Sequence, residues 1–385
     1  MMLSKQNNRV LSGYIRIVAG ALLLGAVFAP RISPAATVNE LIAKAKQEGV
    51  LNATVTSSLT GRTTPLLIAA FKKRFGLDIA ITLTPVGDTE NYPRAVAEAK
   101  AGTVPTYDSI EGSEVENISL LGVGGIQQID NWRSLLAEVN PLVRSGKVRP
   151  EVLSPAVLSG YGFAHHIRVK GILYNPKLIS LKDLPRTHAE LVDPKYKGKW
   201  CQPPWTTHWD IGPMVFPDMD KEKWLEIVRN AGKNAGTVQV ENNCVQRVLL
   251  GEFAFTLANT YYAFAARAKD AKASLEITYF KDYNLMTAPY YIVRKGARRP
   301  AAATLFALWM TTPESEAIWQ PELFASQFLW GESELDKREK QFIQDSGAKV
   351  VDLLTTDKGR DLLAWYGTEE GRRYRQAIGK AIRGE

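Results

Sequence analysis

Two adjacent tyrosines, Tyr261 and Tyr262, are the residues whose type and spacing best suit ligand chemistry. They follow a strand that the sequence predicts over residues 252–257, and they begin a predicted helix. Neighbouring side chains on a strand point to opposite faces, but at a strand-to-helix turn two phenols can converge on one point. Phenolates are hard oxygen donors for a trivalent cation, whereas neutral phenols donate hydrogen bonds to an anion or stack on a ligand. The pair therefore predicts a ligand site, with simple packing of both rings as the alternative.

Other polar and aromatic residues follow other predicted strands. Ligands of open α/β sheets bind at the carboxyl ends of the strands, where loops lead into helix N-termini that attract negative charge. Any hydroxyl or amide side chain in such a loop could instead cap a helix. The candidates that we expect to bind the ligand together with the two tyrosines are Ser57, Ser58, Glu111, Ser113, His166, Trp205, His208, Asn243 and Thr260.

Three of these candidates have a specific structural alternative. His166 lies at an expected crossing between two halves of the fold, where it or His165 could face a cleft or satisfy a hydrogen bond in the core. Trp205 could stack on a ligand or pack against the edge of its half of the fold. Asn242 and Asn243 are expected to cap the next helix with their amides facing the same end of the sheet. The sequence leaves these possibilities open.

Predicted strands and helices alternate along most of the chain, which predicts parallel sheets covered by helices in an α/β fold. We expect strands at 163–174 and 289–293 to cross between two halves of the fold. After residue 293 we expect only helices, the last of them punctuated by Gly347, Gly359 and Gly371. The other strands are expected at 50–56, 77–83, 107–110, 200–202, 237–240, 252–257 and 275–280.

Residues 171–200 carry the most specific pattern in the sequence. An apolar strand ends in Tyr-Asn-Pro, and then a Leu-Pro step, Leu-Val-Asp-Pro-Lys and Lys-Gly-Lys lead to a new strand. This order resembles the periplasmic solute-binding proteins of ABC importers, and it is most similar to their ferric-iron-binding branch. Those proteins carry an Asn-x-Tyr-Tyr-like motif after a Gly-Glu strand start, and here Gly251-Glu252 precedes such a motif at residues 259–262.

The resemblance implies a type II periplasmic-binding-protein fold. Two α/β lobes, each a mixed and mostly parallel sheet flanked by helices, would be joined by crossing hinge strands. Lobe 1 would comprise residues 36–167 and 290–340, and lobe 2 residues 168–289 and 341–385 with a helical C-terminal tail. Such a protein closes on a small ligand and delivers it to an ABC permease in the inner membrane.

The resemblance leaves the ligand and two rival functions open. Tyr261 and Tyr262 would be the ligands of ferric iron, the one metal that the sequence suggests. The chain departs from the iron-binding pattern, because serines and threonines fill the first loop where a histidine often stands, and Glu90 or Glu111 would have to supply a carboxylate. Relatives with paired tyrosines also bind organic or phosphorylated anions. A periplasmic enzyme or a ligand-loaded sensor could use the same fold, although the sequence has no Gly-x-Ser-x-Gly or His-Glu-x-x-His motif.

Residues 1–35 have the pattern of a cleaved signal peptide. A basic start is followed by an apolar run over 17–29 and by the small residues Ser33-Pro34-Ala35 before a cleavage point. The run is shorter than the roughly 20 residues that a membrane-spanning helix needs, and a retained anchor is the alternative. We therefore expect a periplasmic protein.

The expected mature chain has a mild charge and two cysteines. Removing residues 1–35 takes away four basic residues and no acidic ones, so the formal charge falls from +8 to +4. That charge, without aromatic residues among basic clusters, argues against nucleic-acid binding, and we expect a monomer. An even cysteine count in an exported chain favours a disulfide between Cys201 and Cys244, with two buried thiols as the alternative.

Overall fold

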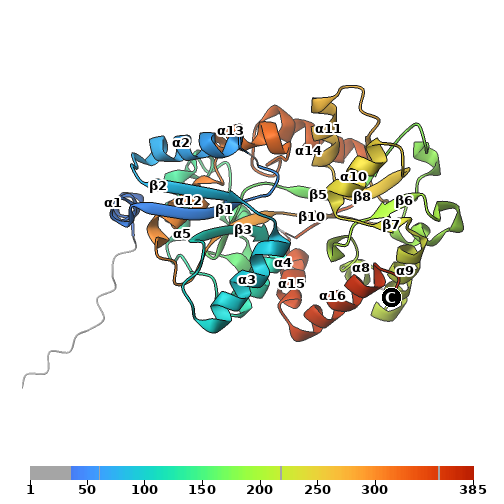
Figure 1. Cartoon of the computed structure of the whole chain (residues 1–385), viewed down its shortest axis with the longest axis horizontal. Helices are drawn as coiled ribbons and strands as arrows, with labels where there is room; N and C mark the ends of the chain where they lie inside the picture. Colours follow the sequence, from blue (N-terminus) through green and yellow to red (C-terminus); the bar gives the residue numbers. More distant parts are fainter. Residues whose placement is uncertain (1–35, 60, 217–218, 354–355) are drawn as a thin grey trace, which may run out of the picture. The chain divides into compact units, whose positions relative to one another are not determined.

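The computed structural model describes residues 36–59, 61–216, 219–353 and 356–385. The predicted signal peptide, residues 1–35, lies outside the described residues. Over the described ranges the strands form two sheets, and helices pack against both (Figure 1). No helix in these ranges is long and apolar enough to span a bilayer.

The first sheet has the strand order β2-β1-β3-β11-β4. Its strands are β1 (Val50–Val55), β2 (Ala80–Pro85), β3 (Ser109–Ser113), β4 (Gly162–Ala164) and β11 (Pro289–Val293). Strand β1 is parallel to β2 and β3, because a helix returns the chain after each strand. Strand β11 enters from the other half and runs antiparallel to β3 and β4.

The second sheet has the strand order β12-β10-β5-β8-β6-β7, and β9 also pairs with β5. Its strands are β5 (Arg168–Tyr174), β6 (Trp200–Gln202), β7 (Thr237–Val238), β8 (Phe255–Asn259), β9 (Glu276–Thr278), β10 (Asn284–Thr287) and β12 (Val350–Asp352). Strand β5 comes from the first half and is antiparallel to β8, β9 and β10. Parallel pairing is confined to β8-β6-β7 and β10-β12, so both sheets are mixed.

The helices cover the sheets and line their edges (Figure 1). The α-helices are α1 (Val38–Glu48), α2 (Thr63–Phe75), α3 (Asp88–Ala101), α4 (Glu114–Gly122), α5 (Trp132–Val139), α6 (Pro141–Arg144), α7 (Pro150–Leu153), α8 (Gly212–Val215), α9 (Lys221–Asn234), α10 (Glu241–Leu249), α11 (Tyr261–Lys269), α12 (Pro300–Trp309), α13 (Pro313–Leu323), α14 (Glu334–Ser346), α15 (Asp357–Tyr366) and α16 (Glu369–Ala381). The 3-10 turns are η1 (Ala156–Leu158), η2 (Leu181–Asp183), η3 (His188–Val192), η4 (Pro194–Tyr196) and η5 (Thr206–His208).

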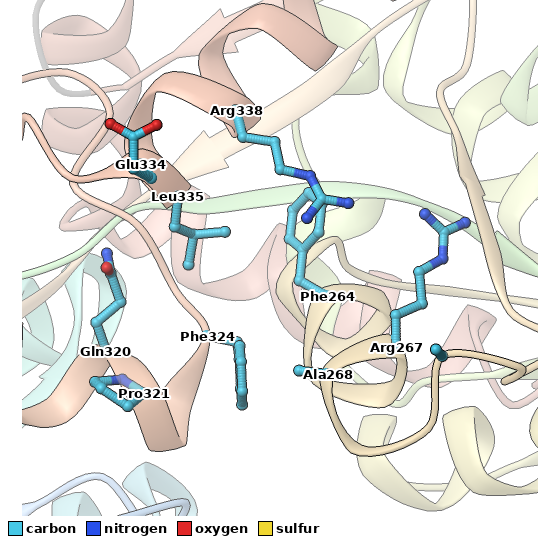
Figure 2. A pocket seen from close by; sticks show the side chains of 10 residues that line it. Phe264, Arg267, Ala268, Gln320, Pro321, Phe324, Glu334, Leu335 and Arg338 are labelled. Atoms are coloured by element: carbon cyan, nitrogen blue, oxygen red, sulfur yellow. The ribbon is translucent and has the colours of Figure 1, made fainter.

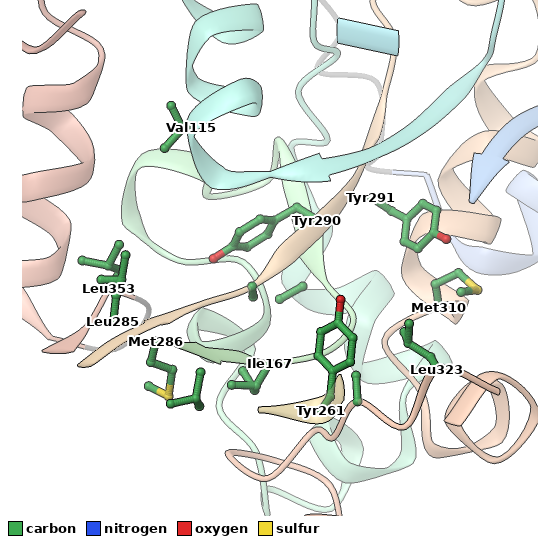
Figure 3. Close-up of a cluster of buried hydrophobic side chains, with 14 of the residues drawn as sticks. Val115, Ile167, Tyr261, Leu285, Met286, Tyr290, Tyr291, Met310, Leu323 and Leu353 are labelled. Carbon is green, nitrogen blue, oxygen red and sulfur yellow. The ribbon is translucent and has the colours of Figure 1, made fainter. Parts of the chain in front are cut away.

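The chain passes between the two sheets in three places. It crosses from β4 to β5 and returns from β10 to β11 through Ala288. It crosses again after α13, where Ser326 forms a bridge with Ile167 and its hydroxyl donates to Glu339 of α14. The boundary expected between residues 340 and 341 falls inside α14, which is continuous. Buried side chains from the crossings, including Ile167, Met286 and Tyr290, pack together (Figure 3).

The prediction that only helices follow residue 293 is wrong. Residues Val350–Asp352 form β12, which pairs in parallel with β10, another strand that the sequence did not predict. Both strands are short, and they depend on pairing with strands far along the chain, β12 with β10 and β10 also with β5. Gly347 does end α14, with a positive φ of 61°. Gly359 and Gly371 instead lie inside the first turns of α15 and α16, where an added Cβ would collide with the preceding backbone.

A covalent link ties the second sheet to one of its helices. Cys201 in β6 and Cys244 in α10 form a disulfide, with their Cα atoms 5.3 Å apart. Both residues are fully buried in the main hydrophobic core, beside Val245 and Val248 of the same helix. The link holds the start of α10 close to the end of β6, at the edge where the candidate site lies.

Candidate functional site

A pocket of about 460 Å³ lies where strand ends of the two sheets face each other. Most of its lining residues end or follow β1, β2 and β3 of the first sheet and β6, β7, β8 and β10 of the second, so it lies at the carboxyl ends of these strands. Arg168 and Lys170 from the start of β5 and Arg375 of α16 complete the lining. The residues are Thr56, Ser57, Ser58, Gly87, Ser113, Glu114, Glu116, Arg168, Lys170, Pro204, Trp205, Thr206, Thr207, Val240, Glu241, Asn242, Asn259, Tyr261, Tyr262, Thr287 and Arg375.

Helices α3, α4, α10 and α11 begin at this pocket. Gly87, Ser113, Val240 and Tyr261, which are N-cap or first residues of these helices, line it. Within the described chain, no side chain caps the first turn of any of them. The first N–H groups of a helix carry partial positive charge and need acceptors. The helix starts therefore offer the pocket backbone donors suited to an anion.

Several other helices in the fold have first N–H groups that side chains satisfy. The carboxylate of Glu48 accepts hydrogen bonds from the backbone N–H groups of Ala301 and Ala302 at the start of α12, both at 2.9 Å. Local side chains cap α1, α9, α14, α15 and α16 through Thr37, Asp220, Ser333, Thr356 and Thr368. Helices α2, α5, α7 and α8 also lack a side-chain cap among the described residues, so what distinguishes the pocket is that four uncapped helix starts meet at one place.

Strand β5 brings two cations to the pocket. Arg168 and Lys170 are two residues apart, so both side chains project from the same face of the strand. Arg168 Nη2 lies 3.3 Å from Glu111 Oε1, and Lys170 Nζ lies 3.3 Å from Glu241 Oε1. A third cation, Arg375 of α16, lies 3.2 Å from Asp210. Each positive charge is held in place by a buried carboxylate.

Burial and pairing set the charges of Lys170 and Glu241. Burial opposes the charged form of Glu241, but the nearby Lys170 and His208 side chains and a hydrogen bond from the Asn259 backbone outweigh it and lower the pKa of Glu241 to about 2. Burial also lowers the pKa of Lys170, against the attraction of Glu241. Glu241 is therefore a carboxylate at neutral pH, and it holds the side-chain nitrogen of Lys170 at the pocket.

Glu114, the first residue of α4, is a buried carboxyl group of a different kind. Neither of its oxygens has a hydrogen-bond partner in another described residue. Burial, with a smaller contribution from Glu116, raises the pKa of Glu114 to about 8. The side chain is therefore mostly a neutral acid at pH 7, and its O–H can donate to a ligand.

The two tyrosines lie side by side in the pocket. Their ring centroids are 4.5 Å apart at an interplanar angle of 34°. Burial raises the pKa of Tyr261 to about 12 and the pKa of Tyr262 well above its ordinary value. The preceding residue, Thr260, donates a 2.8 Å hydrogen bond to Glu339 of α14, which fixes the turn between β8 and α11. In the absence of a metal ion the phenols are neutral hydrogen-bond donors.

The pocket contains some of the predicted residues and not others. Ser57, Ser58, Ser113, Trp205, Tyr261 and Tyr262 line it. Glu111, His166, His208, Asn243 and Thr260 do not. Glu90, considered as a carboxylate donor, is exposed on α3 and is not part of the lining either.

The residues outside the lining have clear structural positions. His166 is fully buried between His165 and Trp319, and burial holds its pKa well below the usual value. His208 is buried behind Glu241, with its Nε2 3.7 Å from Oε1. Glu111 lies behind Arg168.

The expectation that Asn242 and Asn243 cap the helix is wrong. Helix α10 begins at Glu241 and its N-cap is Val240, so both asparagines lie in the first turn. Successive helical residues differ in direction by about 100°, so only one of them can face the pocket. Asn242 lines the pocket and Asn243 is exposed elsewhere.

Sequence reasoning missed the charged residues of the pocket. Arg168 and Lys170 alternate along an otherwise apolar strand, a signal that could have been used to place them on one face of β5. Glu114 and Glu241 follow predicted strands, but only nearby residues such as Ser113 and Asn243 were predicted as ligand contacts. Arg375 had no local signal, because its spacing is typical of the exposed face of a helix.

A second hollow, of about 500 Å³, lies between α11, α13 and α14 (Figure 2). Its lining is largely apolar and includes Phe264, Phe324 and Leu335. The guanidinium of Arg338 lies over the Phe264 ring, 5.4 Å from its centroid. None of the predicted site residues lines this second hollow. The pocket between the strand ends is therefore the candidate ligand site.

Solved structures of periplasmic binding proteins have the same fold. Iron-bound HitA from Pseudomonas aeruginosa is 19% identical with a TM-score of 0.59, over 72% of this chain and 85% of that one. AfuA from Actinobacillus pleuropneumoniae, with fructose-6-phosphate bound, is 17% identical with a TM-score of 0.63, over 86% and 97%. AgtB from A. tumefaciens R10, in complex with agropinic acid, is 16% identical with a TM-score of 0.59, over 85% and 99%. A search of curated proteins gave no significant match.

Two mixed sheets joined by crossing strands, with a pocket at their facing strand ends, define the type II periplasmic-binding-protein fold. Residues 67–320 match the family model for bacterial extracellular solute-binding proteins. The chain belongs to this family of solute-binding proteins.

Proposed function

We propose that the chain is the substrate-binding component of an ABC importer and that it binds a small organic or phosphorylated anion in the pocket described above. The observation that carries this proposal is the meeting of three cations, Arg168, Lys170 and Arg375, with the uncapped starts of four helices among the described residues. Charge-assisted hydrogen bonds to carboxylate or phosphate oxygens are the natural use of such a set of donors.

The remaining lining supports an organic ligand with polar substituents. Trp205 and Tyr262 offer aromatic faces for a ring or chain, while Ser57, Ser58 and Asn242 offer hydrogen bonds to hydroxyls. A volume of about 460 Å³ suits a molecule of sugar-phosphate size. The AfuA and AgtB structures, which hold fructose-6-phosphate and agropinic acid, also favour this ligand class.

A thermal-shift screen of the chain from residue 36 onward tests the proposal. The screen contains fructose-6-phosphate, agropinic acid, citrate and inorganic phosphate, with fructose as the uncharged control. A ligand that binds only the folded protein raises the melting temperature in proportion to the logarithm of its concentration. We expect at least one anion to do so and fructose to have little effect. A protein that responds to none of the anions contradicts the proposal.

Ferric iron is a second candidate ligand because of the paired tyrosines. Two phenols with ring centroids 4.5 Å apart in a pocket could bind Fe(III) as phenolates, and HitA is iron-bound. Iron would have to displace the protons of both phenols and bind near the cations Arg168 and Lys170. Because like charges repel, an anion bound together with the iron would favour this arrangement. A visible phenolate-to-iron charge-transfer band with ferric citrate, lost in Tyr261→Phe/Tyr262→Phe, would establish this ligand. A colourless protein would exclude it.

The proposed function also implies a cellular location and a protein partner. We propose a periplasmic, monomeric protein that is released by cleavage after residue 35 and docks on an inner-membrane ABC permease. Mass spectrometry of the protein from the periplasmic fraction checks the cleavage, and light scattering checks the monomer. An enzyme on the same fold would convert the bound anion, so recovery of the ligand unchanged after prolonged incubation separates binding from catalysis.

A further inference from the structure

The C-terminal helices contact both halves of the fold. Helix α15 packs on α4 and η1, which adjoin the first sheet, and α16 packs on α9 and η5, which adjoin the second (Figure 1). Both helices lie beyond residues 67–320, the part of the chain that matches the family model. The tail therefore adds contacts to the fold close to the strand ends that form the pocket.

One side chain of this tail, Arg375, is held in a fixed orientation. Its Nε donates to Asp210 Oδ2 at 3.2 Å, and its Nη2 donates to Thr206 Oγ1 at 3.1 Å. The guanidinium also lies over the Tyr366 ring, 5.3 Å from the centroid. Asp210 is fully buried and accepts a 2.9 Å hydrogen bond from the Tyr366 hydroxyl. Residues of α15, α16 and η5 thus fix the position of a single guanidinium.

The free edge of this guanidinium belongs to the pocket. Arg375 lines the pocket, and about one fifth of its side chain is exposed. Its bonds to other described residues use Nε and Nη2, which leaves Nη1 as a donor. Burial opposes its charge, but the carboxylates of Asp210 and Glu116 outweigh burial and raise the pKa of Arg375. The group remains a cation next to the space that a ligand would fill.

We propose that the C-terminal helix pair completes the ligand site and that Arg375 determines specificity by binding a terminal phosphate or carboxylate group of the ligand. Asp210 and Tyr366 act as positioning residues for it. This inference rests on the proposed function and deepens it. A buried ion pair such as Arg375–Asp210 often contributes little to stability. Since the Arg375 guanidinium also lines the pocket, ligand binding is the better explanation for this cation.

Two variants and a matched control test the inference by isothermal titration with fructose-6-phosphate, agropinic acid and citrate. Arg375→Gln removes the charge, and Asp210→Asn/Arg375→Gln removes it without leaving a buried carboxylate unpaired. The control, Arg373→Gln, makes the same charge change at an exposed position of the same helix. We expect the dissociation constant for the anion that binds wild type to rise about tenfold or more in both Arg375 variants and to change less than twofold in the control.

The outcomes separate this inference from the proposed function. If the double variant melts like wild type and binds the anion within about twofold of wild type, the cation is only structural and the inference is overturned. If the wild-type protein binds none of the anions in the thermal-shift screen, the proposed function fails and the inference fails with it. Equal weakening in the Arg373→Gln control would also overturn it, because the effect would then be one of overall charge.

Discussion

The two sides of the pocket differ in charge and in the kind of donor that they offer. The side that follows the first sheet consists of Thr56, three serines, Gly87 and the acidic residues Glu114 and Glu116. The side that follows the second sheet carries Arg168 and Lys170 and all of the aromatic lining, and the tail adds Arg375 there. The second-sheet side therefore provides fixed positive charge, stacking surfaces and the starts of α10 and α11, whereas the first-sheet side provides hydroxyls, two acidic side chains and the starts of α3 and α4.

This difference suggests an order of events during binding. Fixed charges attract an anion at a distance, whereas hydroxyls and helix starts act only at hydrogen-bond contact. We expect the second-sheet side to capture the ligand first and the first-sheet side to close over it. If so, substitutions on the charged side weaken binding more than substitutions on the hydroxyl side.

The largest effect is expected for Lys170→Met. Its ammonium is buried against Glu241, so the substitution removes a ligand contact and leaves a buried carboxylate unpaired. We expect loss of measurable anion binding and a fall of about 3–5 kcal/mol in the free energy of unfolding. Calorimetry and urea denaturation measure the two effects. Lys170→Met/Glu241→Gln should recover most of the stability and none of the binding; recovered binding would show that Lys170 acts only through Glu241.

The next largest effect is expected for Tyr261→Phe/Tyr262→Phe. This double variant keeps both rings and removes only the hydroxyls, so the melting temperature should stay close to that of wild type. The dissociation constant should rise by about ten- to a hundredfold, because two buried donors to the ligand are lost. Titration of the same anion into both proteins checks this. Unchanged affinity would place the tyrosines outside the site.

Glu114→Gln tests whether the Glu114 carboxyl on the first-sheet side has a raised pKa, through the pH dependence of the free energy of unfolding. The pKa of Glu114 is about 8 in the folded chain against an ordinary value of 4.5. Because the pKa of Glu114 is raised in the folded chain, the neutral acid stabilises the fold fully below pH 4.5. This stabilisation is lost as the pH rises toward 8, by up to about 1.4 kcal/mol per pH unit. Urea denaturation at pH 5 and pH 8 measures the free energy of unfolding of both proteins. Relative to wild type, Glu114→Gln should be more stable at pH 8 than at pH 5. An equal difference at both values would contradict the shifted pKa.

The same variant should change how binding depends on pH. Above about pH 8 the wild-type Glu114 becomes an anion and repels an anionic ligand, so affinity should fall several-fold between pH 7 and pH 9. In Glu114→Gln this part of the pH dependence should disappear. Titrations at the two pH values measure it, with a ligand whose own ionisation is constant over that range.

The smallest effect is expected for Ser57→Ala/Ser58→Ala on the hydroxyl side. Both side chains are exposed in the described structure, so stability should not change. Each hydroxyl is exposed to water and contributes one neutral hydrogen bond at the low end of the usual range, about 0.5 kcal/mol, so loss of both should lower affinity about fivefold. If this variant weakens binding as much as Lys170→Met, the charge difference between the two sides does not control affinity.

The sequence by itself determined the features that depend on neighbouring residues. Strands β6 and β11 have the predicted bounds, because proline and glycine turns mark their ends. The alternation of strands and helices predicted the α/β class, and loops at strand ends predicted where a ligand site would lie. The pattern over residues 171–200 indicated the solute-binding family to which the chain belongs.

Only the tertiary structure decided which side chains meet in the pocket. His166 and Asn242 had similar local signals, yet packing buried the first behind Trp319 and turned the second to the pocket. The charges of the site are set by partners far along the chain: Lys170 pairs with Glu241, 71 residues away, and Arg375 with Asp210, 165 residues away. The physical reason is that periodicity and turn chemistry act between neighbours, whereas burial and charge pairing depend on segments that only the folded chain brings together.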